Sequence, residues 1–139
     1  MYSLFKNAEF RKLIVDLNFF EQLGAKGVDA KGKQLEQQYT GYKTYSPKTI
    51  KLKKEFGRGL GAITEHITLY DTGEFYKSGK VEFKDGSFII TADTIKDDTD
   101  LIDAWGEDIL GLNEESLSEL RQMAIEIIIP TIQRKILGV

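Results

Sequence analysis

The fold class is decided by residues 80–92, which read KVEFKDGSFIITA. An Asp-Gly pair in the middle of this stretch is a strong hairpin signal, because both central positions of the tight turn favour positive φ. The runs on either side are rich in β-branched and aromatic residues, and their apolar side chains alternate. The stretch therefore predicts two antiparallel strands, at 80–83 and 87–92, with one buried face.

Two long amphipathic segments, at residues 5–24 and 114–136, lie on either side of this hairpin in the sequence. Apolar residues recur three or four positions apart in both, which is typical of a helix with one buried face. Glycines at 24 and 27 are expected to end the first helix, and Asn113 to cap the second. The buried face of the first helix is predicted to hold Phe10, Leu13, Ile14, Leu17 and Phe20, widened by Val15 and Phe19. That of the last helix is predicted to hold Leu117, Leu120, Ala124, Ile127, Ile128 and Thr131.

Shorter elements are expected between these segments. Ser46-Pro47 is a favourable helix start, so a short helix is predicted over 46–55. Residues 63–69 are expected to form a short strand, Asp71 or Thr72 to open a brief helix, and residues 101–105 to form a helical turn. Pro130 should kink or end the last helix, since it removes an amide donor.

This order of elements indicates a single α+β domain spanning residues 1–139. Long N- and C-terminal helices are expected to pack on a small, mostly antiparallel sheet, with an extended basic loop at about 25–62. We call this loop the arm. Its many lysines, its glycines and its few apolar residues predict that it is mobile in the free subunit and becomes ordered only through contacts with partners.

The composition excludes several classes of chemistry. The chain has no cysteine, which rules out disulfides, thiolate zinc sites and cysteine nucleophiles. It has one histidine, His66, for which a structural role is expected. Its longest strictly apolar run, Ile127-Ile128-Ile129-Pro130, is far shorter than a membrane span, and residues 1–6 do not resemble a secretory signal. We therefore expect no cofactor, no metal and no membrane partner.

An enzyme with this composition would have to rely on carboxylates. The candidates are Asp97, Asp98, Asp100 and Asp103, and nothing in their spacing argues for a catalytic pair. The acidic stretch 93–103 also fails to match the positions of a calcium-binding loop. The chain is accordingly expected not to be an enzyme.

The charges are strongly divided along the chain. Residues 26–60 carry nine basic and three acidic side chains, whereas residues 93–119 carry ten acidic side chains and one lysine. Such blocks either form solvated surfaces or attract each other between copies. We expect the basic block to lie near the acidic face of a neighbouring subunit or of another protein, in a head-to-tail contact. The acidic face consists of Asp97, Asp98, Asp100 and Asp103.

Tyrosines and lysines alternate in the arm. This pattern favours a partner-binding surface, because tyrosine combines a large contact area with a polar tip. The expected contact residues are Tyr39, Tyr42, Lys43, Tyr45, Lys51, Lys53 and Lys54. The alternative is a nucleic-acid-binding module over residues 26–60, in which the tyrosines stack on bases of a single strand.

The string Leu69-Tyr70-Asp71-Thr72-Gly73-Glu74-Phe75-Tyr76-Lys77-Ser78 resembles a threonine-glycine signature of bacteriophage virion-morphogenesis and tail-completion proteins. Two further pieces resemble the family in the same order. They are residues 45–49, which read YSPKT, and residues 108–115, which read DILGLNEE before the last helix. The signature positions carried over are Leu69, Asp71, Thr72, Gly73, Phe75 and Ser78.

The resemblance implies a non-enzymatic structural component of a virion. Such proteins form rings at the neck or the head-proximal end of the tail and join portal-side to tail-side components. Their α+β fold agrees with the order of elements given above. The implied partners are other copies of the chain and other virion proteins, with incidental contact to packaged DNA. The implied location is the head–tail junction or the tail, after assembly in the host cytoplasm. Thr72 and Gly73 would then be a structural pivot.

Overall fold

The computed structural model of the 139-residue chain describes residues 7–37, 41–84, 87–96 and 99–137. The fold is α+β, as the sequence predicts. A long N-terminal helix comprises α1 (Ala8–Asp16) and the π-helix η2 (Leu17–Lys26), and a long C-terminal helix forms α5 (Glu114–Leu137). Between them the chain forms α2 (Pro47–Phe56), the short helix η3 (Gly59–Ala62) and α3 (Glu74–Lys77). These are followed by a hairpin of β1 (Lys80–Lys84) and β2 (Ser87–Thr91), then by β3 (Ile95–Lys96), β4 (Thr99–Asp100), α4 (Leu101–Trp105) and η4 (Glu107–Ile109).

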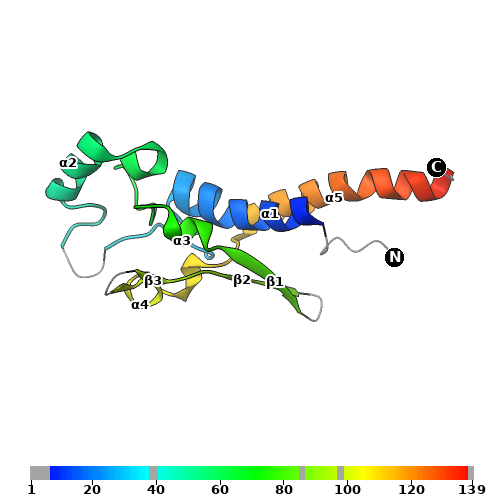
Figure 1. Ribbon diagram of the computed structural model, residues 1–139. Coiled ribbons are helices and arrows are strands. Elements are labelled where there is room, and N and C mark those ends of the chain that lie inside the picture. The colour runs from blue at the N-terminus through cyan, green and yellow to red at the C-terminus, as the bar shows by residue number, and fades with distance from the viewer. Residues whose placement is uncertain (1–6, 38–40, 85–86, 97–98, 138–139) are drawn as a thin grey trace.

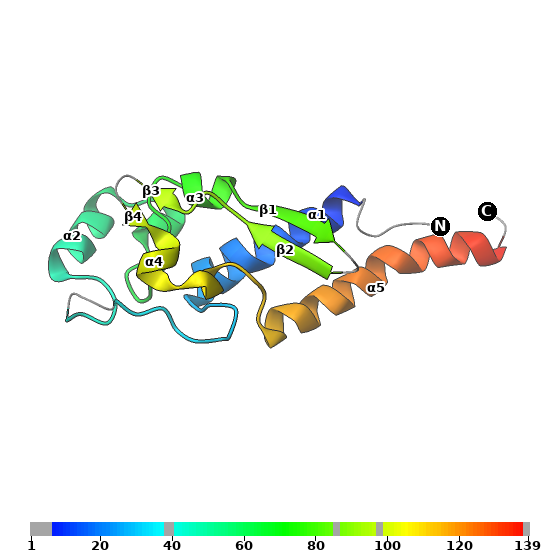
Figure 2. The same cartoon turned by 90° about the horizontal axis from the view of Figure 1, so that it is seen from below.

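The molecule is elongated. Figure 1 shows α1 beside the first turns of α5, with the β1–β2 hairpin on the other side of α1. The later turns of α5 extend beyond this body at one end, while α2 lies at the opposite end (Figures 1 and 2). The core lies between α1, η2, α3 and the hairpin. Its most deeply buried apolar side chains are Ile14, Leu17, Phe19, Leu23, Ile67 and Ile109.

The predicted β1–β2 hairpin is confirmed. The strands are antiparallel, with Val81 opposite Ile90 and Phe83 opposite Phe88. Val81 and Ile90 are buried, and the rings of Phe83 and Phe88 meet edge to face at a centroid distance of 6.4 Å. A second, two-residue hairpin of β3 and β4, which the sequence analysis did not predict, follows at once.

The predicted buried face of the first helix is wrong at one position. Phe20 is 50% exposed, whereas Phe19 and Leu23 are fully buried. The reason is that η2 is a π-helix, whose i→i+5 hydrogen bonds widen each turn and shift the phase of the buried stripe. The helix ends as expected at Gly27, which has a φ of 65°. A Cβ at Gly27 would stand 2.6 Å from Cδ2 of His66.

The expected caps are confirmed, and two other expectations need correction. The amide of Thr49 donates to Ser46 Oγ, and the amide of Ser116 donates to Asn113 Oδ1. Of the two effects expected of Pro130, ending the helix is wrong, because α5 continues to Leu137; one missing amide donor interrupts a single hydrogen bond and leaves the helix on both sides intact. Residues 63–69 form no strand, because their buried backbone groups bind side chains and their path turns at a positive φ, as described below.

The arm is more structured than an extended loop. Its first part folds back through a bridge between Val28 and Gln34, and Leu35 is buried in the core with 4% of its surface exposed. Its second part forms α2 and η3. The expectation of little burial is therefore wrong for residues 27–35, while α2 itself contains no buried residue. Mobility of the arm in the free subunit stays a prediction.

Candidate docking groove

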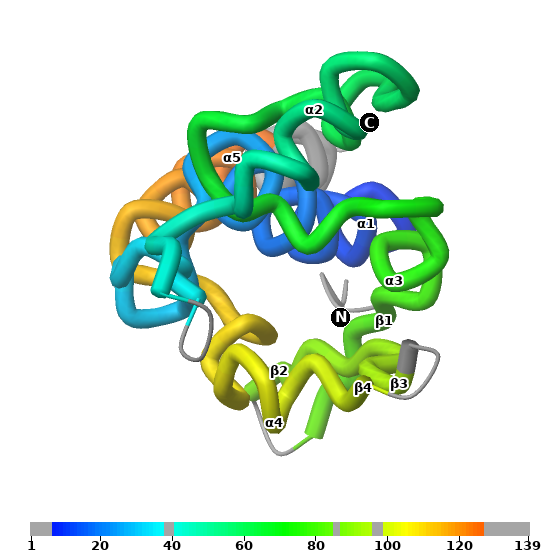
Figure 3. Tube along the Cα trace, turned by 90° about the vertical axis from the view of Figure 1, so that its left-hand side faces the viewer, coloured from blue at the N-terminus to red at the C-terminus, as the bar shows by residue number. Residues whose placement is uncertain are grey.

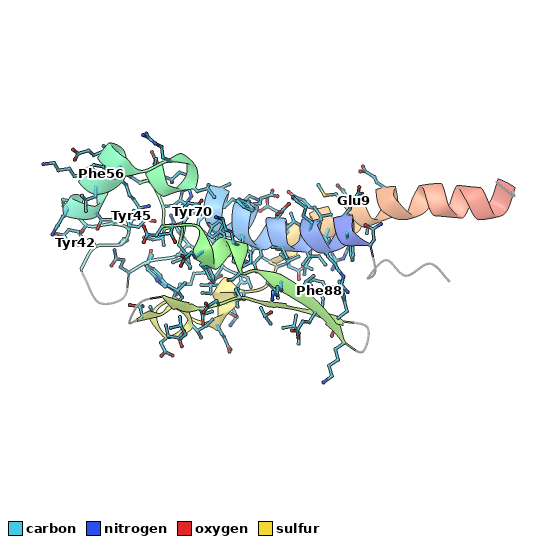
Figure 4. The ribbon with its side chains drawn as sticks, in the orientation of Figure 1. Glu9, Tyr42, Tyr45, Phe56, Tyr70 and Phe88 are labelled. Atoms are coloured by element: carbon cyan, nitrogen blue, oxygen red, sulfur yellow. The ribbon has the colours of Figure 1, made fainter. Side chains whose placement is uncertain are left out.

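Three segments singled out in the sequence meet at the α2 end of the molecule. They are the arm, the signature loop (residues 68–73) and α4. Figure 4 shows Tyr42, Tyr45, Phe56 and Tyr70 together at this end, with Phe88 and Glu9 far away along the chain's long axis. Between the three segments lies an open groove of about 810 Å³. Apolar lining comes from Leu52, Phe56, Ile67, Leu69, Leu101 and Trp105.

Tyr45 joins the arm to the signature loop. Its Oη accepts a hydrogen bond from the amide of Thr68 at 3.1 Å and lies 3.5 Å from the Thr68 hydroxyl. On the other side, Tyr76 Oη donates to the carbonyl of Thr68 at 2.6 Å. Thr68 is completely buried, so these two tyrosines supply the backbone partners that a strand neighbour would otherwise provide.

Leu69 occupies the left-handed region with a φ of 57°, the only described residue other than glycine to do so. For a leucine this conformation costs on the order of 1–3 kcal/mol. It persists because Thr68 is held on both sides and because the amide of Tyr70 donates to Thr68 Oγ1 at 3.2 Å. The strained turn aims the Leu69 side chain into the lining of the groove.

The remaining signature positions are structural in this arrangement. Gly73 has a φ of 89°, and a Cβ there would stand 2.7 Å from Tyr70 Oη. Asp71 and Thr72 line the groove. Phe75 is buried, and Ser78 Oγ accepts from the amide of Asp93, which ties α3 to the end of β2. The signature thus shapes one wall of the groove and attaches it to the hairpin.

The cations of the arm have different surroundings. Lys53 Nζ donates to the carbonyl of Gly61 at 3.1 Å and lies 4.5 Å from the centre of the Tyr45 ring, so its charge stabilises the arm internally. Lys51 and Lys54 are exposed on α2, as is Lys43 just before it. Within the described part of the chain, none of these three exposed lysines forms an ion pair.

Part of the basic and acidic blocks already meet within one chain. Lys26 Nζ lies 2.7 Å from Glu115 Oε1, and Lys31 Nζ lies 3.3 Å from Asp108 Oδ2. The hydrogen bond to Glu115 raises the pKa of Lys26, which is consistent with a formed pair. The two blocks are therefore partly neutralised within one chain, at Lys26 and Lys31.

The acidic residues are placed unequally. Asp100 Oδ1 accepts from the amide of Ile102 at 2.9 Å and caps α4, whereas Asp103 is exposed. Asp97, Asp98 and Tyr39 lie outside the described residues.

The apolar part of the groove was missed by the sequence analysis, although a signal for it existed. Leu52 and Phe56 are one helical turn apart on the lysine-rich helix α2, and they are 47% and 70% exposed. An apolar pair at this spacing on a charged helix indicates a contact face. Trp105, the chain's single tryptophan, lines the groove with part of its surface accessible.

Among the side chains that the structure describes, no group of three or more histidines, cysteines or carboxylates is close enough to hold a metal ion. Over the same residues, no helix is both long enough and apolar enough to cross a membrane.

Comparisons with known proteins find no matching family model, no similar curated protein and no similar solved structure.

Proposed function

We propose that this protein is a non-enzymatic structural component of a phage virion, a ring-forming connector or tail-completion protein that joins portal-side and tail-side components. The observation that carries the proposal is the groove at the α2 end. The threonine-glycine signature, the tyrosine-lysine arm and the acidic helix α4 are far apart in the sequence, yet all three line it.

The chemistry of this groove suits binding to a protein. Its floor is apolar, Lys53 and the exposed Arg58 line it, and Phe56 presents most of its ring to solvent. A contiguous apolar patch with a polar rim is typical of a protein–protein contact surface. The strained backbone at Leu69 also fits a recognition site, since strain of this kind is retained where the surrounding structure holds a functional conformation.

Light scattering of the purified full-length chain, alone and mixed with candidate portal and tail proteins, tests the proposal. We expect a defined complex with at least one of these proteins, and we expect Phe56→Asp to abolish it. Ile89→Asp is the matched control, because Ile89 is also an exposed apolar side chain, 54% accessible, but lies on the β1–β2 hairpin away from the groove. Failure of the chain to bind any virion protein, or equal binding by both variants, would contradict the proposal.

Nucleic-acid binding is a second candidate, favoured by the exposed lysines around α2, which form no ion pair among the described residues. It would give an affinity for DNA that falls steeply with added salt, because each phosphate contact releases a counterion. We expect only weak binding, since Tyr45 is engaged with Thr68 and Lys53 and is not available to stack on bases.

A further inference from the structure

The groove has a buried apolar floor and a partly exposed apolar wall. Ile67 and Leu101 form the floor, with 1% and 8% of their surfaces exposed. Leu52 and Phe56 line the groove from α2 and are 47% and 70% exposed. An apolar side chain inserted from outside would therefore bury apolar area that the subunit alone leaves in water.

The segment that carries α2 is positive. Residues 43–58 carry six basic side chains and one acidic side chain. Lys53 and Arg58 line the groove, and Arg58 is exposed and makes no ion pair among the described residues. The partner segment that complements this charge is acidic and carries an apolar anchor.

The chain itself has a segment with this chemistry. Ile95 on β3 is 60% exposed, and the stretch 93–103 holds five aspartates and one lysine. The described residues of this segment hold one another in place: the amide of Ile95 donates to Asp93 Oδ1 at 3.2 Å, and Ile95 pairs with Asp100 between β3 and β4. The amide of Leu101 donates to the carbonyl of Thr94 at 2.8 Å, which anchors the hairpin to α4.

The groove beside α2 and the β3–β4 hairpin are placed so that the same contact could repeat from one subunit to the next. Seen along the long axis of the molecule, α2 lies on one side of the chain and the β3–β4 hairpin on the opposite side (Figure 3). Subunits placed side by side would therefore bring the hairpin of one near the α2 side of the next. A contact between two different surfaces repeats head to tail and closes into a ring when the rotation permits.

We propose that the groove of one copy binds the β3–β4 hairpin of a second copy, with Ile95 inserted between Phe56, Leu69 and Trp105. The inference deepens the proposed function and rests on it for the closure into a ring. Ile95 provides the buried anchor, and the acidic segment that carries it meets Arg58 and the basic segment that carries α2. The charges mainly raise the association rate and select the orientation.

Two complementary full-length variants test this contact. Ile95→Asp disables the hairpin and keeps the groove. Phe56→Asp with Trp105→Phe disables the groove, keeps the hairpin and removes the only tryptophan. Circular dichroism first establishes that both are folded, and Ile89→Asp again serves as the control for loss of an exposed isoleucine.

By sedimentation, we expect wild type and Ile89→Asp to self-associate, and each disabled variant to associate at least about tenfold more weakly. Mixing the two disabled variants should yield a one-to-one dimer, because one intact groove then meets one intact hairpin. Since the hairpin donor has no tryptophan, a saturable change in Trp105 emission on mixing reports occupancy of the groove, and added salt should slow its onset.

A monomeric wild type, or unaltered self-association of Ile95→Asp, would overturn the inference. Self-association of the disabled variants without formation of the mixed dimer would overturn it as well. None of these results bears on binding to portal or tail proteins, so the proposed function is judged separately by the light-scattering experiment described above.

Discussion

Gly79 lies against the fully buried ring of Phe19, and a Cβ placed on it would stand 2.5 Å from Phe19 Cε2. Phe19 cannot move aside easily, because its ring is in edge-to-face contact with both Phe75 and Tyr76. The absence of a side chain at this position, immediately before β1, is therefore a packing requirement of the core.

Gly79→Ala is expected to lower the free energy of unfolding by about 1–3 kcal/mol, the usual cost of an overpacked core. Gly61→Ala is the control, because a Cβ there would meet its nearest neighbour, Tyr70 Cδ1, at an ordinary 3.6 Å. Urea denaturation of both variants provides the measurement. Equal stability of the two alanine variants would show that Phe19 yields more readily than its contacts indicate.

Tyr76 links the stability of the molecule to alkaline pH. Burial raises the pKa of its phenol far above the ordinary value of 10.0, with smaller contributions from Tyr45 and Tyr70. Above the pKa of the unfolded chain, the unfolded state loses this proton and the folded state keeps it. Stability is therefore fully present below pH 10 and falls as the pH rises further.

We expect the free energy of unfolding to fall by about 1.4 kcal/mol per pH unit above roughly pH 10 on account of this phenol. Tyr76→Phe should be less stable than wild type at neutral pH, because the hydrogen bond to the Thr68 carbonyl is lost, but should show a shallower alkaline decline. Urea titrations between pH 8 and 11 measure both slopes. If the unfolding free energies of wild type and Tyr76→Phe fell with the same slope, another titrating group would be responsible for the loss of stability at alkaline pH.

At the scale of elements, η2 is held to the loop before α5 by two buried amide side chains. Asn18 donates to the carbonyl of Ile109 and accepts from the amide of Gly111. Gln22 donates to the carbonyl of Gly111 and accepts from the amide of Asn113. These four hydrogen bonds satisfy backbone groups of the loop that a neighbouring β-strand would otherwise pair with. They also hold Asn113 in position to cap α5.

Asn18→Leu should cost about 2–4 kcal/mol of unfolding free energy, since it leaves a buried carbonyl and a buried amide without their partners. Lys12→Ala on the preceding helix removes only an exposed ion pair with Asp16 and should cost less than about 1 kcal/mol. Chemical denaturation compares the two. A loss for Asn18→Leu as small as that for Lys12→Ala would mean that water can substitute for the amide.

The elements themselves were largely predictable where their signals are local. The Asp-Gly hairpin, the Ser46-Pro47 start of α2 and the Asn113 cap of α5 were all placed correctly, because each depends on hydrogen bonds within a few residues. The π-helical phase of η2 was not predictable in this way. The π-helix buries Asn18 and Gln22 against a loop about 90 positions later in the chain. The spacing of apolar residues within the helix gives no information about such a distant contact.

At the scale of the whole molecule, the arm divides into a held part and a weakly held part. Leu35 is in the core and Lys31 is paired with Asp108, whereas α2 has no buried residue and is fastened mainly through Tyr45. Segments with little burial open locally at low free energy, so the two parts should differ in their resistance to proteolysis.

Limited trypsin digestion of the isolated protein should cut at Lys43 to Arg58 well before it cuts at Lys26 to Lys33. Tyr45→Phe should accelerate the early cuts several-fold, because the buried amide of Thr68 loses its acceptor. Tyr70→Phe is the control, as its hydroxyl makes no hydrogen bond to another described residue. Mass spectrometry of the first fragments identifies the sites, and first cleavage at Lys31 would contradict this division of the arm.

Local composition by itself determined the α+β class, the two long helices, the central hairpin and the helix caps, because turn preferences, amphipathic periodicity and side-chain caps act over a few residues. It also revealed the basic and acidic blocks. Only the tertiary structure decided that Lys26 and Lys31 pair with the acidic block in the same chain, that residues 63–69 are not a strand, and that the arm, signature and α4 enclose one groove. Each of these depends on burial or on hydrogen bonds between residues distant in the sequence, such as Tyr45 and Thr68. Such contacts stabilise the protein only once the chain has folded and brought the residues together.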